Sequence, residues 1–453
     1  MTDLAGIRVV VMGLGRFGGG VGVTRWLAEQ GADVVVTDLE TETSLAESVA
    51  AIGDLVDSGR VSLRLGGHNV SDFTTCDLVV ANPAVPRPWE NRFLRAAEAA
   101  GVPVTTEIAL LVSRLPSRAR TIGVTGSVGK STTTAMIAHA LGETVGDTVL
   151  GGNLGGSLLG RLGSISEGTW VVLELSSAML YWLERDPALA GERAWSPHIA
   201  VVTNIAANHL DWHGDLEHYR DSKQHLLRHQ REGDHAVLGV SVADWRTAAA
   251  ATTRIVDAEA FDLPLTVPGA HNRENAAAAL LACRAAEPGI DPSRFAAAIA
   301  AFPGLPHRLQ LVAEAGGVRF YNDSKSTTPG AALMAIAAIA AMPGMSRDRI
   351  HLIAGGYDKK IDLSPIADAA PDLAGLYTVG QTGRALADLA ASRGARATFA
   401  ETIGGAVEAA RPRLAPGHAL VLSPGCASWD QFENYEKRGE FFIRCVQALA
   451  AKG

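Results

Sequence analysis

A glycine-rich stretch, GVTGSVGKSTTT at residues 123–134, carries the residue types that hold a nucleotide's phosphates. Such a site needs a turn of exposed N–H groups, a lysine as a point charge and a hydroxyl for Mg²⁺. The strict pattern also places glycine six residues before the lysine, where this chain has Val124. A strand-like segment precedes the turn and a helix is expected over residues 133–141, so a helix N-terminus would stand behind the phosphates. A plain turn in which GKS occurs by chance is the weaker interpretation. We therefore predict a nucleotide site formed by Gly126, Ser127, Val128, Gly129, Lys130, Ser131 and Thr132.

A second glycine-rich loop near the N-terminus fits the pattern GxGxxG. It follows an apolar strand and opens a helix, and an acidic residue ends the next strand about 20 residues on. This context predicts a diphosphate at a helix N-terminus and a carboxylate on a ribose hydroxyl. A nicotinamide cofactor, another nucleotide diphosphate and a bare structural turn all remain open. We expect Gly19, Gly20 and Gly22 to widen the loop beyond the usual pattern. The candidate residues are Gly13, Leu14, Gly15, Arg16, Gly18 and Asp38.

Four polar residues between positions 153 and 223 could complete a phosphoryl-transfer site. Glu174 ends a buried strand-like run, where an unpaired carboxylate is costly, so a Mg²⁺ ligand is favoured over a helix-cap partner. His209 in NHLDWHG and Lys223 in HYRDSKQHLL are, by residue type alone, more often structural or solvent-exposed. Asn153 in GGNLGG is either a turn residue or a group that aligns a reacting carboxylate or phosphate.

Two phosphate-binding loops in one chain restrict the possible chemistry. A dehydrogenase would use the first loop and leave the second idle. A kinase or an ATPase would use the second and leave the first idle. A ligase that spends ATP on a nucleotide-activated substrate would use both.

The elements that must position these residues alternate between apolar strand-like runs and helical segments, which predicts an α/β fold. The pattern restarts near residues 115–120 and again near residues 302–308. We therefore predict three α/β domains over residues 1–117, 118–305 and 306–453. Buried parallel strands are expected to be this apolar. The candidates are IRVVVMG, DVVVTD, CDLVVANP, GVPVTTE, TIGVTG, WVVLELSS, HIAVVTNI, VRFYND, IHLIAGG, LYTVG and HALVLSPG.

Composition limits the partners of the chain. The formal net charge is -8 and there is no Lys/Arg-rich block, so nucleic acid and acidic membranes are poor candidates. No apolar run is long enough for a membrane span, and the N-terminus lacks the features of a signal peptide. The four cysteines are scattered without a CxxC pair, which indicates free thiols in a reducing compartment. We expect a cytosolic enzyme that works as a monomer.

The order of several motifs resembles the Mur ligases, the ATP-dependent amide-forming enzymes of peptidoglycan precursor synthesis. The resemblance covers essentially the whole chain, and its last block is most specific for the glutamate-adding member of the family. The motifs are GVTGSVGKSTTT, GGNLGG, LELSSAML, TNIAANHLDWHG, PGAHNRENAAAALL, FPGLPHR, FYNDSKSTTPGAA, AGGYDKKIDLSP and LSPGCASWDQFENYEKRGEFF.

The resemblance implies a Rossmann-like first domain for a UDP-sugar substrate, a central ATP domain and a Rossmann-like third domain that binds the amino acid. It implies UDP-N-acetylmuramoyl-L-alanine and D-glutamate as substrates, with an acyl phosphate between the two steps. Metal ligation falls to Ser131, Glu174, His209 and Lys223, the last as a carbamate formed with CO₂. ATP contacts fall to Asn272, Asn275, Arg308, Asp323 and Lys325. Amino-acid contacts fall to Thr327, Lys359, Ser428 and Tyr435.

Four positions depart from the family pattern. Asn208 stands where the family usually has Asp, Thr328 and Val128 stand where it has Asn, and RFGGGVG replaces a shorter, hydroxyl-bearing loop at the UDP site. Alternatives remain for the activity. They are the same chemistry with L-glutamate or another amino acid, a nicotinamide-dependent oxidoreductase that uses only the first loop, and a non-catalytic nucleotide sensor.

Overall fold

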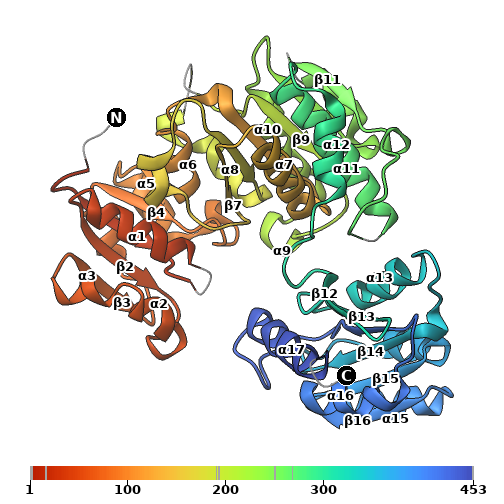
Figure 1. Ribbon diagram of the computed structural model, residues 1–453. Coiled ribbons are helices and arrows are strands. Elements are labelled where there is room, and N and C mark those ends of the chain that lie inside the picture. Colours follow the sequence, from red (N-terminus) through yellow and green to blue (C-terminus); the bar gives the residue numbers. More distant parts are fainter. Residues whose placement is uncertain are drawn as a thin grey trace. The chain divides into compact units, whose positions relative to one another are not determined.

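A computed structural model describes residues 4–15, 18–189, 191, 194–248, 251–267 and 269–450 of the chain (Figure 1). Three mostly parallel sheets confirm the predicted α/β class. The chain packs into two compact units. The first unit comprises Met1–Asp262 and Glu274–Ile299, and the second comprises Leu263–Arg273 and Ala300–Gly453. In the described part of the chain, no helix is long and apolar enough to cross a membrane.

The first sheet has five parallel strands in the order β3-β2-β1-β4-β5. Its strands are β1 (Arg8–Met12), β2 (Asp33–Asp38), β3 (Val61–Leu65), β4 (Leu78–Ala81) and β5 (Val104–Thr105). Its helices are α1 (Gly19–Glu29), α2 (Ala46–Ala50), α3 (Gly53–Asp57), α4 (Val70–Thr74), α5 (Arg92–Ala99) and α6 (Glu107–Val112).

The second sheet, in the same unit, has six parallel strands in the order β11-β10-β9-β6-β8-β7. Its strands are β6 (Thr121–Thr125), β7 (Thr148–Gly152), β8 (Trp170–Glu174), β9 (Ile199–Val202), β10 (His235–Leu238) and β11 (Thr252–Ile255). Its helices are α7 (Lys130–Thr144), α8 (Ser177–Arg185), α9 (Leu210–His213), α10 (Leu216–Arg228), α11 (Ala270–Ala286) and α12 (Pro292–Ala300).

The third sheet, in the second unit, has the order β12-β13-β17-β14-β15-β16, and only its edge pair β12·β13 is antiparallel among the described strands. Its strands are β12 (Gln310–Ala315), β13 (Val318–Asn322), β14 (Ile350–Gly355), β15 (Gly375–Val379), β16 (Ala397–Glu401) and β17 (Ala419–Leu422). Its helices are α13 (Pro329–Ala340), α14 (Ser364–Ala369), α15 (Gly383–Ser392), α16 (Ile403–Ala410) and α17 (Tyr435–Ala450).

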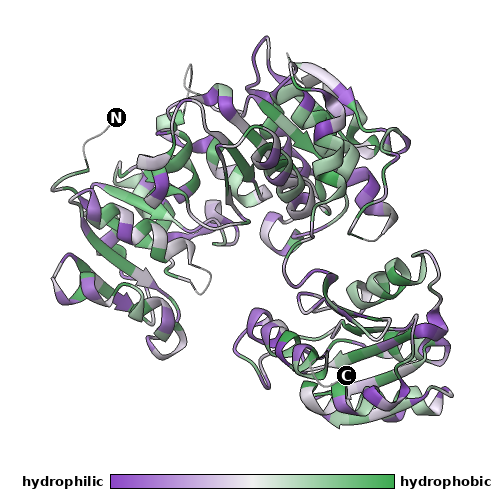
Figure 2. Cartoon of the chain, viewed as in Figure 1, coloured by the Kyte–Doolittle hydropathy of each residue, from purple (hydrophilic) through white to green (hydrophobic). Residues whose placement is uncertain are grey.

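Burial on both faces explains why the strands are continuously apolar. In β1, Val9 and Val11 belong to one buried hydrophobic cluster, while Val10 and Met12 belong to another on the opposite face. Helices that cover both faces of a parallel sheet produce this pattern. Figure 2 shows the same feature, since the strands are mostly hydrophobic while the helices carry both hydrophobic and hydrophilic residues.

The extra glycines of the first loop do not widen it, so that prediction was wrong. Gly19, Gly20 and Gly22 lie inside α1, which begins directly after Gly18. A Cβ on Gly20 would lie 2.2 Å from the carbonyl oxygen of Leu14, which no side chain tolerates. The glycines therefore allow α1 to pack closely, and the loop keeps its usual length.

Candidate active site

The predicted nucleotide loop joins the end of β6 to the start of α7. Gly126 has φ 147° and Gly129 has φ 86°, which only glycine adopts readily. A Cβ on Gly126 would lie 2.0 Å from Oγ1 of Thr203, and one on Gly129 would lie 2.4 Å from Oδ1 of Asn275. α7 starts at Lys130, three residues earlier than expected, with Gly129 as its N-cap. The loop is thus a tight glycine turn with a helix N-terminus directly behind it.

Asn204 holds the middle of this loop from both sides. The Val128 N–H donates to Oδ1 of Asn204 at 2.9 Å, and Nδ2 of Asn204 donates to the Val128 carbonyl at 3.0 Å. The Thr203 hydroxyl donates to the same carbonyl at 2.6 Å. The Val128 side chain is exposed, so this position is used through its backbone. That explains why valine can stand where the resemblance leads one to expect asparagine.

Sequence reasoning missed Asn204 and Thr203. Both directly follow the apolar strand β9, which pairs with β6 in parallel. The carboxyl ends of neighbouring parallel strands meet at one edge of a sheet. The sequence did contain a signal for both residues: they are polar and directly follow an apolar strand that could be expected to pair with β6.

Ser127 is an anchor of the loop rather than an open hydroxyl. Its Oγ accepts from the Ala206 N–H at 2.8 Å and donates to the Ala206 carbonyl at 2.9 Å. It also lies 3.0 Å from the hydroxyl of Tyr219 on α10. These contacts tie the loop to the segment after β9 and to α10.

Glu174, at the end of β8, is buried and only half satisfied. Its Oε1 accepts from Nδ2 of Asn153 at 2.7 Å. Its Oε2 has no hydrogen-bond partner among the described residues. An ionised carboxylate oxygen in this position is costly unless a cation binds it. Asn153 is therefore more than a turn residue, because it orients a carboxylate whose free oxygen suits a divalent cation.

Lys223 lies on α10, as predicted, and its side chain is buried with 1% exposure. Its Nζ donates to the Gly126 carbonyl at 2.8 Å and to Oγ1 of Thr125 at 3.3 Å. Burial, reinforced by the charge of Lys130, holds the pKa of Lys223 well below its ordinary value, although Glu174 opposes the shift. A lysine in these surroundings reaches its neutral amine form easily.

Lys130 and His209 complete the charged groups around the loop. The Lys130 Nζ donates to the carbonyls of Gly126 and Ser127, each at 3.1 Å. His209 is the N-cap of α9 with φ 52°, and its backbone N–H donates to Oδ1 of Asn208. Desolvation and then the charge of Lys130 lower the pKa of the His209 ring. The imidazole is therefore neutral at pH 7, which is the form that ligates metals.

The structure thus brings four of the predicted residues into electrostatic range of one another. Lys130 and Glu174 both act on the pKa of Lys223, and Lys130 and Lys223 both act on that of His209. The site fits Mg²⁺, because the unpartnered carboxylate oxygen of Glu174 and the hydroxyl of Ser131 are oxygen ligands of the kind that Mg²⁺ prefers. Ser131 lies in the first turn of α7, beside Lys130.

The contact between His213 and His218, which follow His209 in the chain, was not predicted from the sequence. His213 is buried, and its Nε2 lies 2.9 Å from the Ser177 hydroxyl at the start of α8. Its Nδ1 lies 2.8 Å from Nδ1 of His218. Desolvation first, and then the charge of His218, lower the pKa of His213 to about 3. These contacts link α9 to α8, which begins shortly after Glu174, and to α10, which carries Lys223.

The first glycine loop is closed by Asp38. Its Oδ2 accepts from the Gly15 N–H at 3.1 Å, and its Oδ1 accepts from the Glu40 N–H at 2.9 Å. The carboxylate therefore holds the loop itself, in addition to any ligand it contacts. Leu14 is fully buried, so this position can contact a ligand only through its backbone. Arg16 lies outside the described residues.

Two of the predicted ATP contacts, Asn272 and Asn275, belong to different compact units although they are close in the sequence. Asn275, in the first unit, accepts from the Thr133 hydroxyl at 3.2 Å and touches the phosphate loop. Asn272, in the second unit, is buried, and its backbone N–H donates to the Gly269 carbonyl.

Asp323 lies in the loop after β13 of the second unit. Its Oδ2 accepts from the Ser423 hydroxyl at 2.7 Å, and its Oδ1 accepts from the Leu309 N–H at 3.0 Å. Burial raises its pKa to about 6, although these hydrogen bonds and the charge of Arg308 oppose the shift. Arg308 is exposed and precedes Leu309. Lys325 follows in the same loop, with its Nζ 5.2 Å from the centre of the Tyr435 ring.

Three of the residues predicted to contact the amino-acid substrate lie in the segments that follow β13, β14 and β17. Lys359 is exposed and stacks its Nζ over the Trp429 ring at 4.5 Å. Ser428 is buried, and Thr327 is partly buried in the loop before α13. Arg438, missed in the sequence, is buried and donates to the Ser324 carbonyl at 2.8 Å and the Cys426 carbonyl at 3.0 Å.

The site combines a phosphate loop, a buried carboxylate with a free oxygen and a buried lysine. This combination is typical of nucleotide-dependent enzymes that use a divalent cation. Three family models match the chain. They are the Mur ligase MurD-like N-terminal domain over residues 7–106, the Mur ligase middle domain over residues 124–257, and the Mur ligase glutamate ligase domain over residues 307–426. The chain belongs to the Mur ligase family of ATP-dependent ligases in peptidoglycan synthesis.

Relatives of similar length support this assignment. A UDP-N-acetylmuramoylalanine--D-glutamate ligase from Roseiflexus sp. is 38% identical over 99% of this chain and 100% of its own. A protein of the same name from Desulfatibacillum aliphaticivorans is 35% identical, with the same coverage. Among solved structures, MurF ligase from Thermotoga maritima in complex with ADP has a TM-score of 0.55 at 16% identity, covering 99% of this chain and 100% of its own. The structural likeness concerns the fold.

Proposed function

We propose that the chain uses ATP to join D-glutamate to UDP-N-acetylmuramoyl-L-alanine. The names of its full-length relatives support these substrates, as does the match to a glutamate ligase domain. The observation that carries the proposal is the group of charges at the phosphate loop, where Lys130 and Lys223 both donate to the Gly126 carbonyl and Glu174 acts on the pKa of Lys223. An oxidoreductase would leave this arrangement without a role.

The proposed reaction has two steps. The alanyl carboxylate of the UDP-substrate attacks the γ-phosphorus of ATP, which forms an acyl phosphate and releases ADP. The neutral amine of glutamate then attacks the acyl carbon, phosphate leaves, and the amide nitrogen loses a proton. Both steps bring anions together, so positioning and charge compensation carry most of the catalysis.

The residues of the chain have separate tasks in this scheme. Lys130 and the N–H groups of the loop bind the ATP phosphates, for which Lys130 must leave the carbonyls that it now contacts. Glu174, Ser131 and His209 would hold Mg²⁺, with Asn153 fixing the Glu174 carboxylate. When bound, Mg²⁺ supplies positive charge that offsets the negative charge on the transferred phosphoryl group.

Lys223 would serve this site as a carbamate. The neutral amine attacks CO₂ and loses a proton, which converts a cationic side chain into an anionic one. A lowered pKa supports this step because it raises the fraction of neutral amine. The carbamate would then be able to hold a second Mg²⁺.

The remaining roles follow the family pattern. We propose that residues 1–117 bind the UDP-substrate through the loop from Gly13 to Gly18 and Asp38, that residues 118–305 bind ATP, and that residues 306–453 bind the amino acid. The ATP contacts would include Asn272, Asn275, Arg308, Asp323 and Lys325. The amino-acid contacts would be Thr327, Lys359, Ser428 and Tyr435. We further propose a monomer that acts in the cytosol, in keeping with four free cysteines.

A phosphate-release assay tests this proposal. Purified enzyme receives ATP, Mg²⁺ and UDP-N-acetylmuramoyl-L-alanine, and the amino acid is varied. Release that depends on D-glutamate supports the proposal, and release with L-glutamate or another amino acid changes the substrate. ATP binding without any turnover would favour a nucleotide sensor instead.

A further inference from the structure

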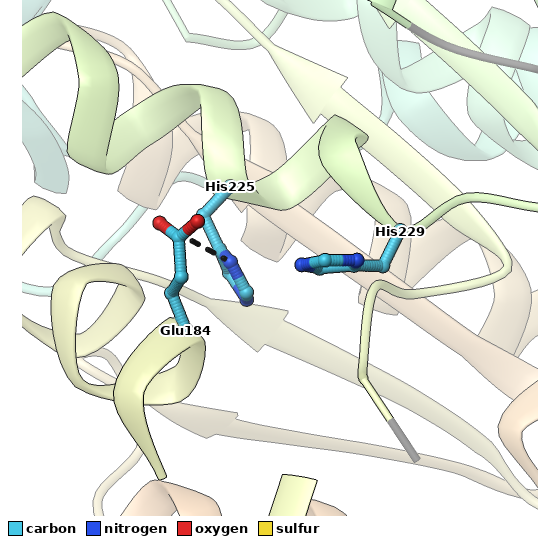
Figure 3. A group of neighbouring side chains, drawn as sticks. All are labelled: Glu184, His225 and His229. Atoms are coloured by element: carbon cyan, nitrogen blue, oxygen red, sulfur yellow. Dashed lines mark ion pairs between the residues drawn. The ribbon is translucent and has the colours of Figure 1, made fainter. Parts of the chain in front are cut away.

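Three ligand-type side chains meet between α8 and α10, apart from the phosphate loop. Glu184 lies in the last turn of α8, His225 lies in the last turn of α10, and His229 directly follows α10. One ligand atom from each residue lies within 4.8 Å of the other two. Figure 3 shows the Glu184 carboxylate beside the His225 ring and the His229 ring turned toward His225.

The His225 ring lacks the partners that a buried imidazole requires. Its side chain is 1% exposed, and neither ring nitrogen has a hydrogen-bond partner among the described residues. The nearest carboxylate atom, Oε2 of Glu184, is 3.7 Å from Nδ1 and is itself buried without a hydrogen bond. That distance is too long for a hydrogen bond. Buried polar atoms left without partners destabilise a fold, so this grouping needs an explanation.

The spacing of the histidines suits a metal ion. His225 and His229 are four residues apart at the end of one helix, which places both rings on the same side. Ligand atoms around zinc stand roughly 3.4 Å apart, given metal–ligand distances of about 2.1 Å in a tetrahedron. Small side-chain rotations would therefore close the site.

We propose that Glu184, His225 and His229 bind one divalent transition-metal ion of the zinc type, which joins α8 to α10. Two imidazoles and one carboxylate form a known zinc donor set. Imidazole ligands favour zinc, copper, nickel or cobalt over magnesium and calcium. Glu184 and His229 are only partly buried, so an ion can enter from their side and keep a water as its fourth ligand.

The surrounding charges set the expected strength of the site. Arg228 donates to Oε1 of Glu184 and to Asp221 at 2.6 Å, which leaves Oε2 of Glu184 for the ion. A hydrogen-bonded carboxylate ligand of this kind is usual in metal sites. Arg185 lies 4.0 Å from the same Oε2 but donates to the Tyr181 carbonyl at 3.2 Å. Two nearby arginines weaken cation binding, so we expect lower affinity than at a thiolate zinc site.

The position of the site indicates a structural task. α8 begins three residues after Glu174, and α10 carries Lys223 two residues before His225. An ion that joins the two helices would therefore fix the elements on which both groups depend. This role is independent of the substrate proposed above, and it holds even if that substrate is wrong.

Direct metal binding provides the test. The full chain is stripped with a chelator and titrated with Zn²⁺ against a chromophoric chelator, in excess Mg²⁺ so that sites for hard cations are filled. We expect about one equivalent of competitive Zn²⁺ in the unchanged chain. We also expect Co²⁺ to give the visible absorption of tetrahedral coordination.

Matched variants decide where the ion binds. Glu184→Gln and His229→Gln should each weaken Zn²⁺ binding at least about tenfold, as expected when a ligand or its support is lost. Glu217→Gln makes the same chemical change at an exposed carboxylate of α10 and should bind as the unchanged chain does. His229 is partly exposed, so this variant should fold even if one at buried His225 does not. Unchanged affinity in folded His229→Gln and Glu184→Gln, or no competitive Zn²⁺ binding in the unchanged chain, would overturn the proposal.

Discussion

At the scale of single residues, burial creates the reactive groups around the phosphate loop. Lys223 and Glu174 are both about 1% exposed, and each would be an ordinary surface charge in another setting. Their residue types were visible in the sequence, and the family resemblance drew attention to them. Their states were not visible, because the free Oε2 of Glu174 and the lowered pKa of Lys223 depend on what packs around them.

Replacing Lys223 tests its proposed carbamate. Lys223→Ala should lose most activity, because the proposed carbamate ligand can no longer form. Short carboxylic acids should restore part of the activity by occupying the vacated space, whereas bicarbonate should not. Lys437→Ala, at an exposed lysine of α17, is the control and should behave as the unchanged enzyme. Full activity in Lys223→Ala, measured by phosphate release, would remove Lys223 from the mechanism.

Asp323 predicts a pH dependence of stability. Its pKa is raised from the ordinary 3.8 to about 6 in the fold, so the folded chain favours the protonated form. That stabilisation is complete below about pH 4 and is lost as the pH rises through about 6. The free energy of unfolding of Asp323→Asn should therefore fall less between pH 4 and pH 6 than that of the unchanged chain. Urea unfolding at several pH values measures this change. Asp388→Asn, at an exposed carboxylate of α15, is the control and should keep the trend of the unchanged chain. Identical slopes in all three proteins would contradict the account.

At the scale of elements, glycines decide how α1 packs. Gly20→Ala should lower the free energy of unfolding by about 1–3 kcal/mol, because its Cβ would press on the Leu14 carbonyl. Gly19→Ala meets open space in the same helix and should stabilise the chain by about 0.4–1 kcal/mol. Chemical unfolding of both variants gives the comparison. Equal effects would show that the contact at Gly20 does not set the packing.

The nucleotide loop depends on a neighbouring strand as much as on its own residues. Asn204→Ala removes two hydrogen bonds to Val128 and should cost about 1–3 kcal/mol of stability. It should also raise KM for ATP, because the loop loses its fixed shape. Val128→Ser changes only an exposed side chain and should leave KM for ATP close to the original value. Steady-state kinetics separate the two variants. A raised KM for ATP in Val128→Ser but not in Asn204→Ala would show that the Val128 side chain, and not Asn204, matters for ATP binding.

The elements that could be predicted were those with strong local patterns. Apolar strands, the helix with Lys223 and the two glycine turns follow from residue types and spacing. Six of the described strands were missed. β3, β7, β11, β12 and β16 are only partly buried, so they lack a continuous apolar run, and β10 is only four residues long. The support from Asn204 and the short loop before α1 were missed because both depend on contacts between segments distant in the sequence.

At the scale of the whole molecule, three matching family models and full-length relatives place the chain among the ATP-dependent ligases of the Mur family. The order of motifs along the chain was enough to predict this family, and several of the motifs directly follow a parallel strand, at the edge of the sheet where ligands bind. The boundaries of three domains stay a prediction, since the described chain packs as two compact units.

The central claim is that this ligase adds D-glutamate, and amino-acid-dependent turnover tests it most directly. Phosphate release from ATP is measured with UDP-N-acetylmuramoyl-L-alanine and either D-glutamate or L-glutamate, followed by mass analysis of the product. The account predicts rapid release and a glutamyl product with D-glutamate alone. Turnover that requires L-glutamate or another amino acid, with none for D-glutamate, would contradict it.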